Sequence, residues 1–206
     1  MKAAGDRTNL SAVVILSISF FILMFSFMSA ASIYSKLLKE NNHGDLGNQS
    51  LSVVYLVFSL SCFMAPKIAK QFSPQKTMSI AASAYSIWIV TGFLATLPEV
   101  SEVFVIMASM FGSILIGIGA SVIWVAQGKY LSECISACPE NTGFYTSLFF
   151  TIVAGSNIFT YLYNSAFLTF FSYNSLFLSD TITTFISVVL FAFLLPNPIK
   201  LKENNN

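Results

Sequence analysis

Charge is what this sequence has least of. Only 9% of its 206 residues are charged, whereas 55% are hydrophobic. A soluble domain usually carries about 25% charged residues, because its surface must be hydrated. The sequence therefore predicts that lipid surrounds most of this protein. Its formal net charge is only +1, so no basic face is available to neutralise phosphates, and a nucleic-acid partner is excluded.

Residues that perform catalysis or bind metals are also scarce. The chain has one histidine, His43, and three cysteines. Cys134 and Cys138 form a C-x3-C pair without histidines nearby, which is a poor zinc signal. Together with Cys62 they are predicted to be reduced thiols, with palmitoylation near the membrane as the alternative. Because no nucleophile and base can be assembled, we expect neither an enzyme nor a cofactor or metal site.

Long apolar runs are abundant. A helix needs about 20 mostly apolar residues to cross the hydrocarbon core, and continuous runs favour helices over the alternating strands of a barrel. The predicted spans are Leu10–Tyr34, Leu51–Ala69, Met78–Leu97, Val103–Ala126, Phe144–Tyr163 and Leu176–Leu195. The sequence thus predicts an all-α membrane protein with an amino terminus (1–9), a six-helix transmembrane domain (10–195) and a polar tail (196–206).

Lysine and arginine are distributed unevenly over the predicted loops. One face of the membrane has only Lys36 and Lys39. The other face holds eight, namely Lys2, Arg7, Lys67, Lys70, Lys76, Lys129, Lys200 and Lys202. Because cytoplasmic loops carry the excess of basic residues, both termini are predicted to be cytoplasmic, in a multi-pass protein of the plasma membrane or an endomembrane.

Small residues recur at every fourth position of the predicted fourth span. They are Ser109, Ser113, Gly117 and Ser121. Such a stripe lets a neighbouring helix approach closely, so we interpret it as a face for helix packing or partner binding, with a substrate path as the alternative. A phosphate-binding loop is excluded, because no strand precedes these glycines and no Gly-Lys-Ser/Thr follows.

Three polar residues near or within the spans have alternative roles. Asp180, with Ser179, is predicted to cap the start of the sixth helix, and a buried ion or proton site is the alternative; no ionisable residue is otherwise placed at mid-membrane. Asn157 lies in the middle of the fifth span, where it either bonds a neighbouring helix or lines a central cavity. Asn48 begins an outer-face Asn-Gln-Ser sequon, a candidate for glycosylation although it lies close to the bilayer.

The stretch "GIGASVIWVAQGKYLSE" (117–133) resembles the fourth-helix signature of the Unc-ninety-three family, a branch of the major facilitator superfamily. The matching positions are Gly117, Gly119, Ala120, Trp124, Gln127, Gly128, Tyr130 and Leu131. The segments "VVYLVFSLSCFMAPKIAKQFSPQKTM" and "TGFYTSLFFTIVAGSNIFTYLY" are similar to the second and fifth helices of the same family.

This resemblance implies a six-helix bundle of two three-helix repeats, normally the amino-terminal half of a twelve-helix protein. The loop "APKIAKQFSPQKTM" lacks the Asp, Arg and Gly of the facilitator gate, which weakens a transport role. We therefore expect a protein that regulates or traffics ion channels, embedded in the lipid bilayer and bound laterally to a channel or receptor. The alternatives are half of a transporter that pairs with a second half-bundle, and a truncated product without separate function.

Overall fold

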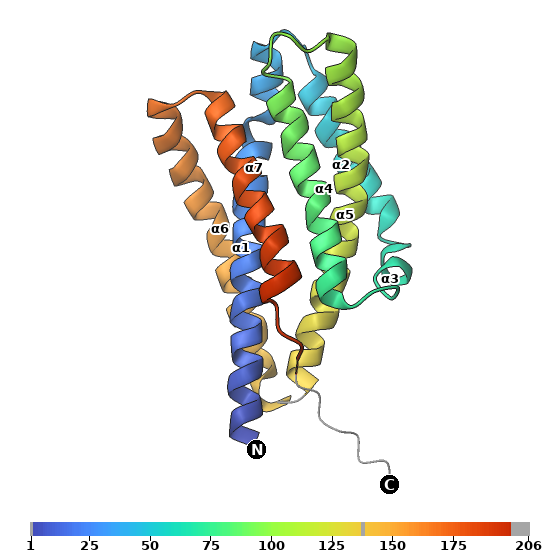
Figure 1. The fold of residues 1–206 in the computed structure, drawn as a ribbon, viewed down its shortest axis with the longest axis vertical. Coiled ribbons are helices and arrows are strands. Elements are labelled where there is room, and N and C mark those ends of the chain that lie inside the picture. Colours follow the sequence, from blue (N-terminus) through green and yellow to red (C-terminus); the bar gives the residue numbers. More distant parts are fainter. Residues whose placement is uncertain (1, 137–138, 199–206) are drawn as a thin grey trace.

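The computed structural model of the chain describes residues 2–136 and 139–198, and every regular element in those ranges is a helix (Figure 1). The all-α fold predicted from the sequence is therefore confirmed for these residues. The long helices are α1 (Lys2–Glu40), α2 (Leu46–Ser61), α4 (Pro74–Leu94), α5 (Glu102–Ser136), α6 (Thr142–Phe170) and α7 (Tyr173–Val189). The short elements are α3 (Ala65–Ile68), a 3-10 turn η1 (Pro139–Asn141) and a π-helical turn η2 (Leu190–Leu194) that continues α7.

Four of these helices are long and apolar enough to cross a membrane. They are Asn9–Glu40, Pro74–Leu94, Glu102–Ser136 and Tyr173–Leu194. The two remaining long helices do not meet that description: α2 has only 16 residues, and α6 contains many serines, threonines, tyrosines and asparagines. The first, third, fourth and sixth predicted spans thus coincide with helices that qualify.

Several predicted boundaries are wrong, and the first and fifth helices extend beyond Tyr34 and Tyr163, to Glu40 and Phe170. The run Leu51–Ala69 is not one helix, because α2 ends at Ser61 and a turn leads into α3. Pro66 explains the break, since proline has no N–H to donate and its ring clashes with the preceding helical turn. The fourth helix does not end at Ala126 but continues to Ser136, which adds ten residues to α5 beyond its apolar run.

The helices form a bundle in which α1 contacts each of the five other long helices. It packs on α6 and α7 and also touches α2, α4 and α5, while α4 packs on both α5 and α7. Figure 1 shows α1 running through the middle of the bundle, behind α7. The packing has an internal symmetry: α5 packs on α2 as α1 packs on α6, so the first three long helices and the last three make equivalent contacts across the bundle.

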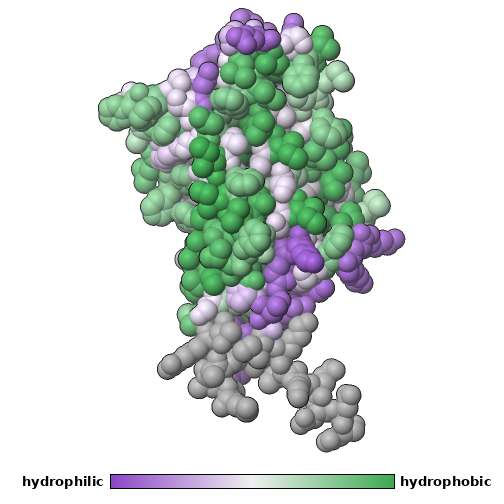
Figure 2. All heavy atoms as spheres, in the orientation of Figure 1, coloured by the Kyte–Doolittle hydropathy of each residue, from purple (hydrophilic) through white to green (hydrophobic). Residues whose placement is uncertain are grey.

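Aromatic side chains fill the centre of the bundle. Trp88 of α4 is fully buried and stacks on Tyr34 of α1 with ring centroids 4.5 Å apart. Phe20 of α1 meets Trp124, Phe149 and Phe191 from three other helices. Large apolar side chains also cover the outside, as Figure 2 shows for one face. An apolar exterior around an apolar core is the distribution expected of helices in lipid.

The loops predicted to share one face of the membrane gather at one end of the bundle. There the side-chain amide nitrogen of Gln75, Nε2, donates to the carbonyl oxygen of Pro196 at 3.4 Å. At the same end, Nδ2 of Asn9 donates to the carbonyl oxygen of Cys134 at 3.2 Å. At the opposite end, Asn42 and Gly44 take φ values of 64° and 54° in the tight turn between α1 and α2.

Candidate functional site

The predicted cap at the start of the sixth helix is wrong. Helix α7 begins at Tyr173, and its N-cap is Ser172, whose hydroxyl accepts a hydrogen bond from the backbone N–H of Ser175. Asp180 therefore lies about two turns inside the helix, and its exposed fraction is 0%. Ser172 and the residues Tyr173 to Ser175, which precede the predicted sixth span, supply the N-cap and the first turn instead. This displacement moves a carboxyl group from the membrane surface into the bundle.

Asp180 meets polar groups from two other helices. Ser29 of α1 lies between them: its Oγ is 2.7 Å from Asp180 Oδ2 and 2.6 Å from Asn164 Oδ1 of α6. The amide nitrogen of Asn164 donates to the carbonyl oxygen of Ser29 at 3.1 Å and to Ser32 Oγ at 3.0 Å. We call Ser29, Ser32, Asn164 and Asp180 the polar cluster. It joins α1, α6 and α7 through side chains that are buried, except Ser32, which is exposed.

Further hydroxyls extend this polar region along α7. One turn beyond Asp180, the Thr184 hydroxyl lies 2.7 Å both from the carbonyl oxygen of Asp180 and from Ser26 Oγ of α1. On the other side, the hydroxyl of Tyr163 donates to Ser179 Oγ at 2.9 Å. Buried hydroxyls and amides must find partners, and here most of them find those partners on neighbouring helices.

One buried oxygen atom of the polar cluster has no hydrogen-bond partner. Asp180 Oδ1 is buried and has no hydrogen-bond partner. The ion pair observed among the described residues joins Lys36 to Glu40 on the surface of α1, and no described lysine, arginine or histidine pairs with Asp180. A buried polar atom without a partner costs about 1–3 kcal/mol, so this carboxyl is the strongest candidate for a functional group in the bundle.

Sequence reasoning missed this cluster for two reasons. Asn164 lies one residue beyond the predicted fifth span, which ended at Tyr163, so it was not considered as an intramembrane amide. Ser29 is one of several serines in α1, and a serine can simply bond its own helix backbone, as Ser17 does with the carbonyl oxygen of Val13. The cluster would have been predicted if the fifth helix had been extended beyond Tyr163 and the sixth helix had been started at Tyr173, well before Asp180.

The small-residue stripe on α5 is buried inside the helical bundle. Gly117 packs on α2, where a Cβ added to it would lie 2.8 Å from Val57 Cβ and 2.9 Å from the carbonyl oxygen of Val54. The hydroxyls of Ser113 and Ser50 form a hydrogen bond between the same two helices. Ser109 accepts a hydrogen bond from the Tyr34 hydroxyl of α1 at 3.2 Å, and Ser121 is buried too. Helix α2 therefore occupies the part of the stripe formed by Ser113 and Gly117, and α1 contacts it at Ser109.

The family-signature residues also face inward, mostly toward other helices. Gly119 packs on α4, where an added Cβ would lie 2.8 Å from Ala84 Cβ. Trp124 contacts Phe20 of α1 with ring centroids 5.4 Å apart, and the Tyr130 hydroxyl donates to the carbonyl oxygen of Pro196 at 2.6 Å. The others are Ala120, which is half-buried, Gln127 and Leu131, which are buried, and Gly128, whose missing Cβ would meet open space.

The two remaining candidate residues are exposed. Asn157 points away from the bundle on α6, and its amide nitrogen reaches only the carbonyl oxygen of Ala154 in the same helix, at 3.4 Å. Asn48 lies in the first turn of α2, and its Oδ1 accepts a hydrogen bond from the Ser35 hydroxyl at 2.7 Å. Among the cysteines, Cys62 is exposed and Cys134 is buried; Cys138 lies outside the described residues.

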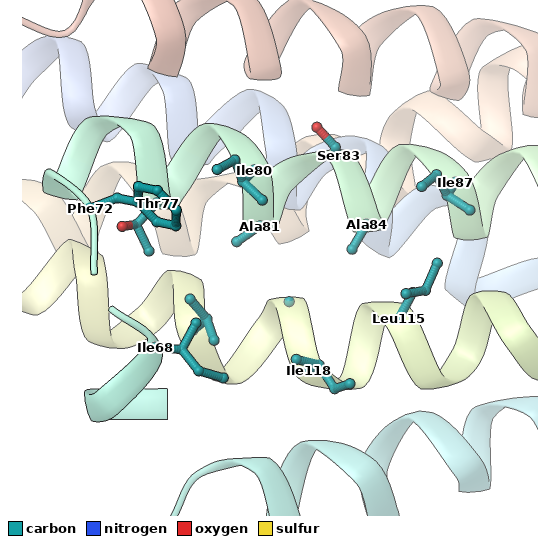
Figure 3. Close-up of a pocket in the computed structure, with 12 residues that line it drawn as sticks. Ile68, Phe72, Thr77, Ile80, Ala81, Ser83, Ala84, Ile87, Leu115 and Ile118 are labelled. Atoms are coloured by element: carbon teal, nitrogen blue, oxygen red, sulfur yellow. The ribbon is translucent and has the colours of Figure 1, made fainter. Parts of the chain in front are cut away.

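A groove of about 380 Å³ opens between α4 and α5 near α3 (Figure 3). Its floor consists of small residues, Ala81, Ala84 and Gly119, so the two helices lie close together there. Its two hydroxyl-bearing residues, Thr77 and Ser83, already donate to backbone carbonyls of their own helix. The groove therefore has no free donor with which to orient a polar ligand, and its shape suits an apolar chain.

The described residues thus define a helical membrane protein: long apolar helices, an apolar exterior and polar side chains that bond one another inside. Residues 39–206 match the family described as "Ion channel regulatory protein UNC-93". Because the match covers most of the sequence, the chain belongs to the UNC-93 family, and the predicted resemblance to this family is confirmed. Membership and the apolar helices together place it in a membrane.

Relatives from several organisms support this assignment. The chain is 28% identical over 165 residues to "UNC93-like protein MFSD11" of Xenopus tropicalis and 29% identical over 166 residues to "Protein unc-93 homolog A" of Bos taurus. Each alignment covers 76% of this chain and 34% of the relative. The chain thus spans about a third of the length of these curated relatives. It is also 30% identical over 128 residues, 62% of this chain and 16% of the relative, to "Putative potassium channel regulatory protein unc-93" of Caenorhabditis elegans. No solved structure matches it.

Proposed function

We propose that this chain is a non-enzymatic regulatory membrane protein that binds another membrane protein laterally, through the outer surface of α6. One observation carries the proposal: polar and small side chains form an exposed stripe along that helix. Its members, which we call the α6 stripe, are Ser147, Thr151, Ala154, Asn157, Tyr161 and Ser165. Their separations of three and four residues place them on one side of the helix.

Lipid is a poor neighbour for this stripe. The hydrocarbon core offers no hydrogen bonds, so an exposed amide such as Asn157 gains by meeting protein instead. Small residues beside it, such as Ala154, let a second helix approach closely. Helix α6 also exposes large apolar residues, including Phe150, Ile158 and Leu162. The exposed residues in the middle of α7 differ in that none of them is polar; they are Leu178, Ile182, Phe185 and Ile186, which suit lipid. Helix α2 presents a similar exposed series, Asn48, Ser52, Tyr55, Ser59 and Cys62.

The names of the relatives suggest the class of partner. The family description refers to ion channels, and the Caenorhabditis elegans relative is named a putative potassium channel regulatory protein. On this basis the partner is a channel or another multi-pass protein whose helices pack against α6. Because the α5 stripe is buried against α2, the proposed contact surface moves from the fourth long helix to the fifth.

The proposal includes a membrane topology. All six long helices cross the membrane, with α2 and α6 sheltered by protein rather than lipid, and the transmembrane domain spans residues 10–195. Both termini lie in the cytoplasm, because the loops near Gln75, Lys129 and Asn9 gather at one end of the bundle and that end carries most of the lysines. Lys200 and Lys202 lie outside the described residues.

Site-specific photo-crosslinking tests the proposal. A photoreactive amino acid is placed at Asn157 in the tagged full chain, and at Phe185 of α7, which is also exposed, as the control. We expect a crosslinked protein of defined mass from position 157 and none from position 185. Mass spectrometry of the product then identifies the neighbour. If both positions react only with lipid, the proposal is refuted.

A second candidate function has an observation of its own. The equivalent contacts of α1 with α6 and of α5 with α2 fit two inverted three-helix repeats, the architecture of half a facilitator. The Xenopus and Bos relatives are about three times as long as the part aligned with this chain. In that case α6 faces a second half-bundle, and Asn157 lines the cavity between the halves. A crosslink from position 157 to a second copy of this chain, together with a saturable flux lowered by Asn157→Leu, would favour it.

A further inference from the structure

The hydrogen bonds of the polar cluster determine where its hydrogen atoms must lie. The amide of Asn164 is fixed by the backbone carbonyl of Ser29, which can only accept, so the nitrogen of that amide must face it. The oxygen Oδ1 of Asn164 therefore faces Ser29 Oγ, 2.6 Å away. Because an amide oxygen can only accept, the hydroxyl of Ser29 must donate its hydrogen to Asn164.

A serine hydroxyl has one hydrogen and can accept further bonds. Once Ser29 donates to Asn164, it has no hydrogen left for Asp180, yet its Oγ lies 2.7 Å from Asp180 Oδ2. That short contact is favourable only if the carboxyl group supplies the hydrogen. We propose that Asp180 binds an exchangeable proton: it is a carboxylic acid in this packing, and loss of the proton loosens α7 from α1 and α6.

The ionised form fits this arrangement poorly. With Asp180 charged, the single hydrogen of Ser29 would face both a carboxylate oxygen and the amide oxygen of Asn164, and the second carboxylate oxygen, Oδ1, has no partner. A charge within the bilayer is expensive unless it is paired or hydrated. Deprotonation therefore favours an opened arrangement that admits water. The O–H bond of the acid breaks, its electron pair stays on the carboxylate, and the proton passes to water or buffer.

The elements around Asp180 present few competing groups. Helix α1 presents Ser26, Ser29 and, beside Phe177, Tyr34, and α6 presents Asn164 and Tyr163. The ionisable groups among them are the two tyrosines, whose hydroxyls are bonded to Ser109 and Ser179 respectively. Helix α4 meets this part of α7 with residues that do not titrate. They are Gly92 beside Phe177, and Ser86, Ile87 and Val90 beside Thr181 and Phe185. No described lysine, arginine or histidine is available to stabilise the charge.

This site goes beyond partner binding, because it lies at the junction of α1, α6 and α7 and not on the outer stripe of α6. Infrared spectroscopy of the purified full chain in phosphatidylcholine vesicles tests it directly. A carboxylic acid has a C=O stretching band separate from those of amides and carboxylates, and the band shifts to lower frequency in D₂O. At neutral pH we expect this band in the wild type, its loss in Asp180→Asn, and its loss on alkaline titration.

The control is Asp45→Asn, which changes an exposed carboxyl before α2 and should leave the band unchanged. We expect Asp180→Asn to fold, because an amide N–H can donate to Ser29 as the acid does. If it yields no folded protein, Ser29→Ala decides: removal of the bonding oxygen should raise the frequency of the band, and an unshifted band overturns the proposal. Absence of the band at neutral pH, its persistence in Asp180→Asn, or its loss on replacing K⁺ by Na⁺ also overturns it.

Discussion

Replacing Gly117 of α5 by alanine tests how closely α2 and α5 are packed. The added Cβ would lie 2.8 Å from Val57 Cβ and 2.9 Å from the carbonyl oxygen of Val54, whereas ordinary contacts are 3.4–4 Å. Val54 O belongs to the backbone, so it cannot rotate away as a side chain can. The two helices must separate to admit the methyl group.

The matched control is Gly128→Ala in the same helix, where an added Cβ meets nothing within 4 Å. Both substitutions gain the higher helix propensity of alanine, about 0.8–1.0 kcal/mol. Only Gly117→Ala also overpacks a contact, which typically costs about 1–3 kcal/mol. The free energies of unfolding of the two variants should therefore differ by about that overpacking cost, with Gly117→Ala the less stable.

Thermal unfolding in a mild detergent, followed by tryptophan fluorescence, measures this difference. For a chain of this size about 1 kcal/mol corresponds to about 2–4 °C in melting temperature, so Gly117→Ala should melt several degrees below Gly128→Ala. Gly119→Ala, which meets Ala84 and the backbone of Ala81 on α4, should behave like Gly117→Ala. Equal melting temperatures for the two main variants would refute the inference that Gly117 is required by close helix packing.

Tyr130→Phe removes the hydrogen bond to the carbonyl oxygen of Pro196 and should lower the free energy of unfolding by about 0.5–1.5 kcal/mol; an unchanged melting temperature would contradict this. Asn48→Gln should leave the mass of the chain from eukaryotic cells unchanged, because the sequon lies in the first turn of α2, and a glycosidase-sensitive mass shift would show the opposite. In sealed vesicles with the bundle in one orientation, and in a chain whose Cys62, Cys134 and Cys138 are replaced by serine, an impermeant thiol reagent should label Lys129→Cys from the side of both termini and Asn42→Cys from the other side; labelling of both from one side would exclude the proposed topology.

The apolar runs and the family signature were sufficient to predict the fold class and the family. A helix in lipid must carry a long apolar stretch whatever its neighbours are, so low charge and long runs predict membrane helices from composition alone. The glycines of the signature can also be interpreted from the sequence alone, because a residue without a side chain lets any neighbouring helix approach closely. Which helix occupies that space could not be read from α5, and it proved to be α2 at Gly117 and α4 at Gly119.

Helix ends and polar contacts were decided by the tertiary structure. The start of α7 depends on Ser172, a weak local signal, because Ser179 seven residues further along is an equally plausible N-cap in the sequence. The shift of seven residues changed Asp180 from a surface cap into a buried acid. Its partners come from positions 29 and 164, more than a hundred residues apart. The sequence by itself determined that this protein is embedded in a membrane, because the free energy of transfer into lipid is a sum over individual side chains. Only the packed bundle decided which polar groups meet, because a hydrogen bond depends on where two distant residues lie in space.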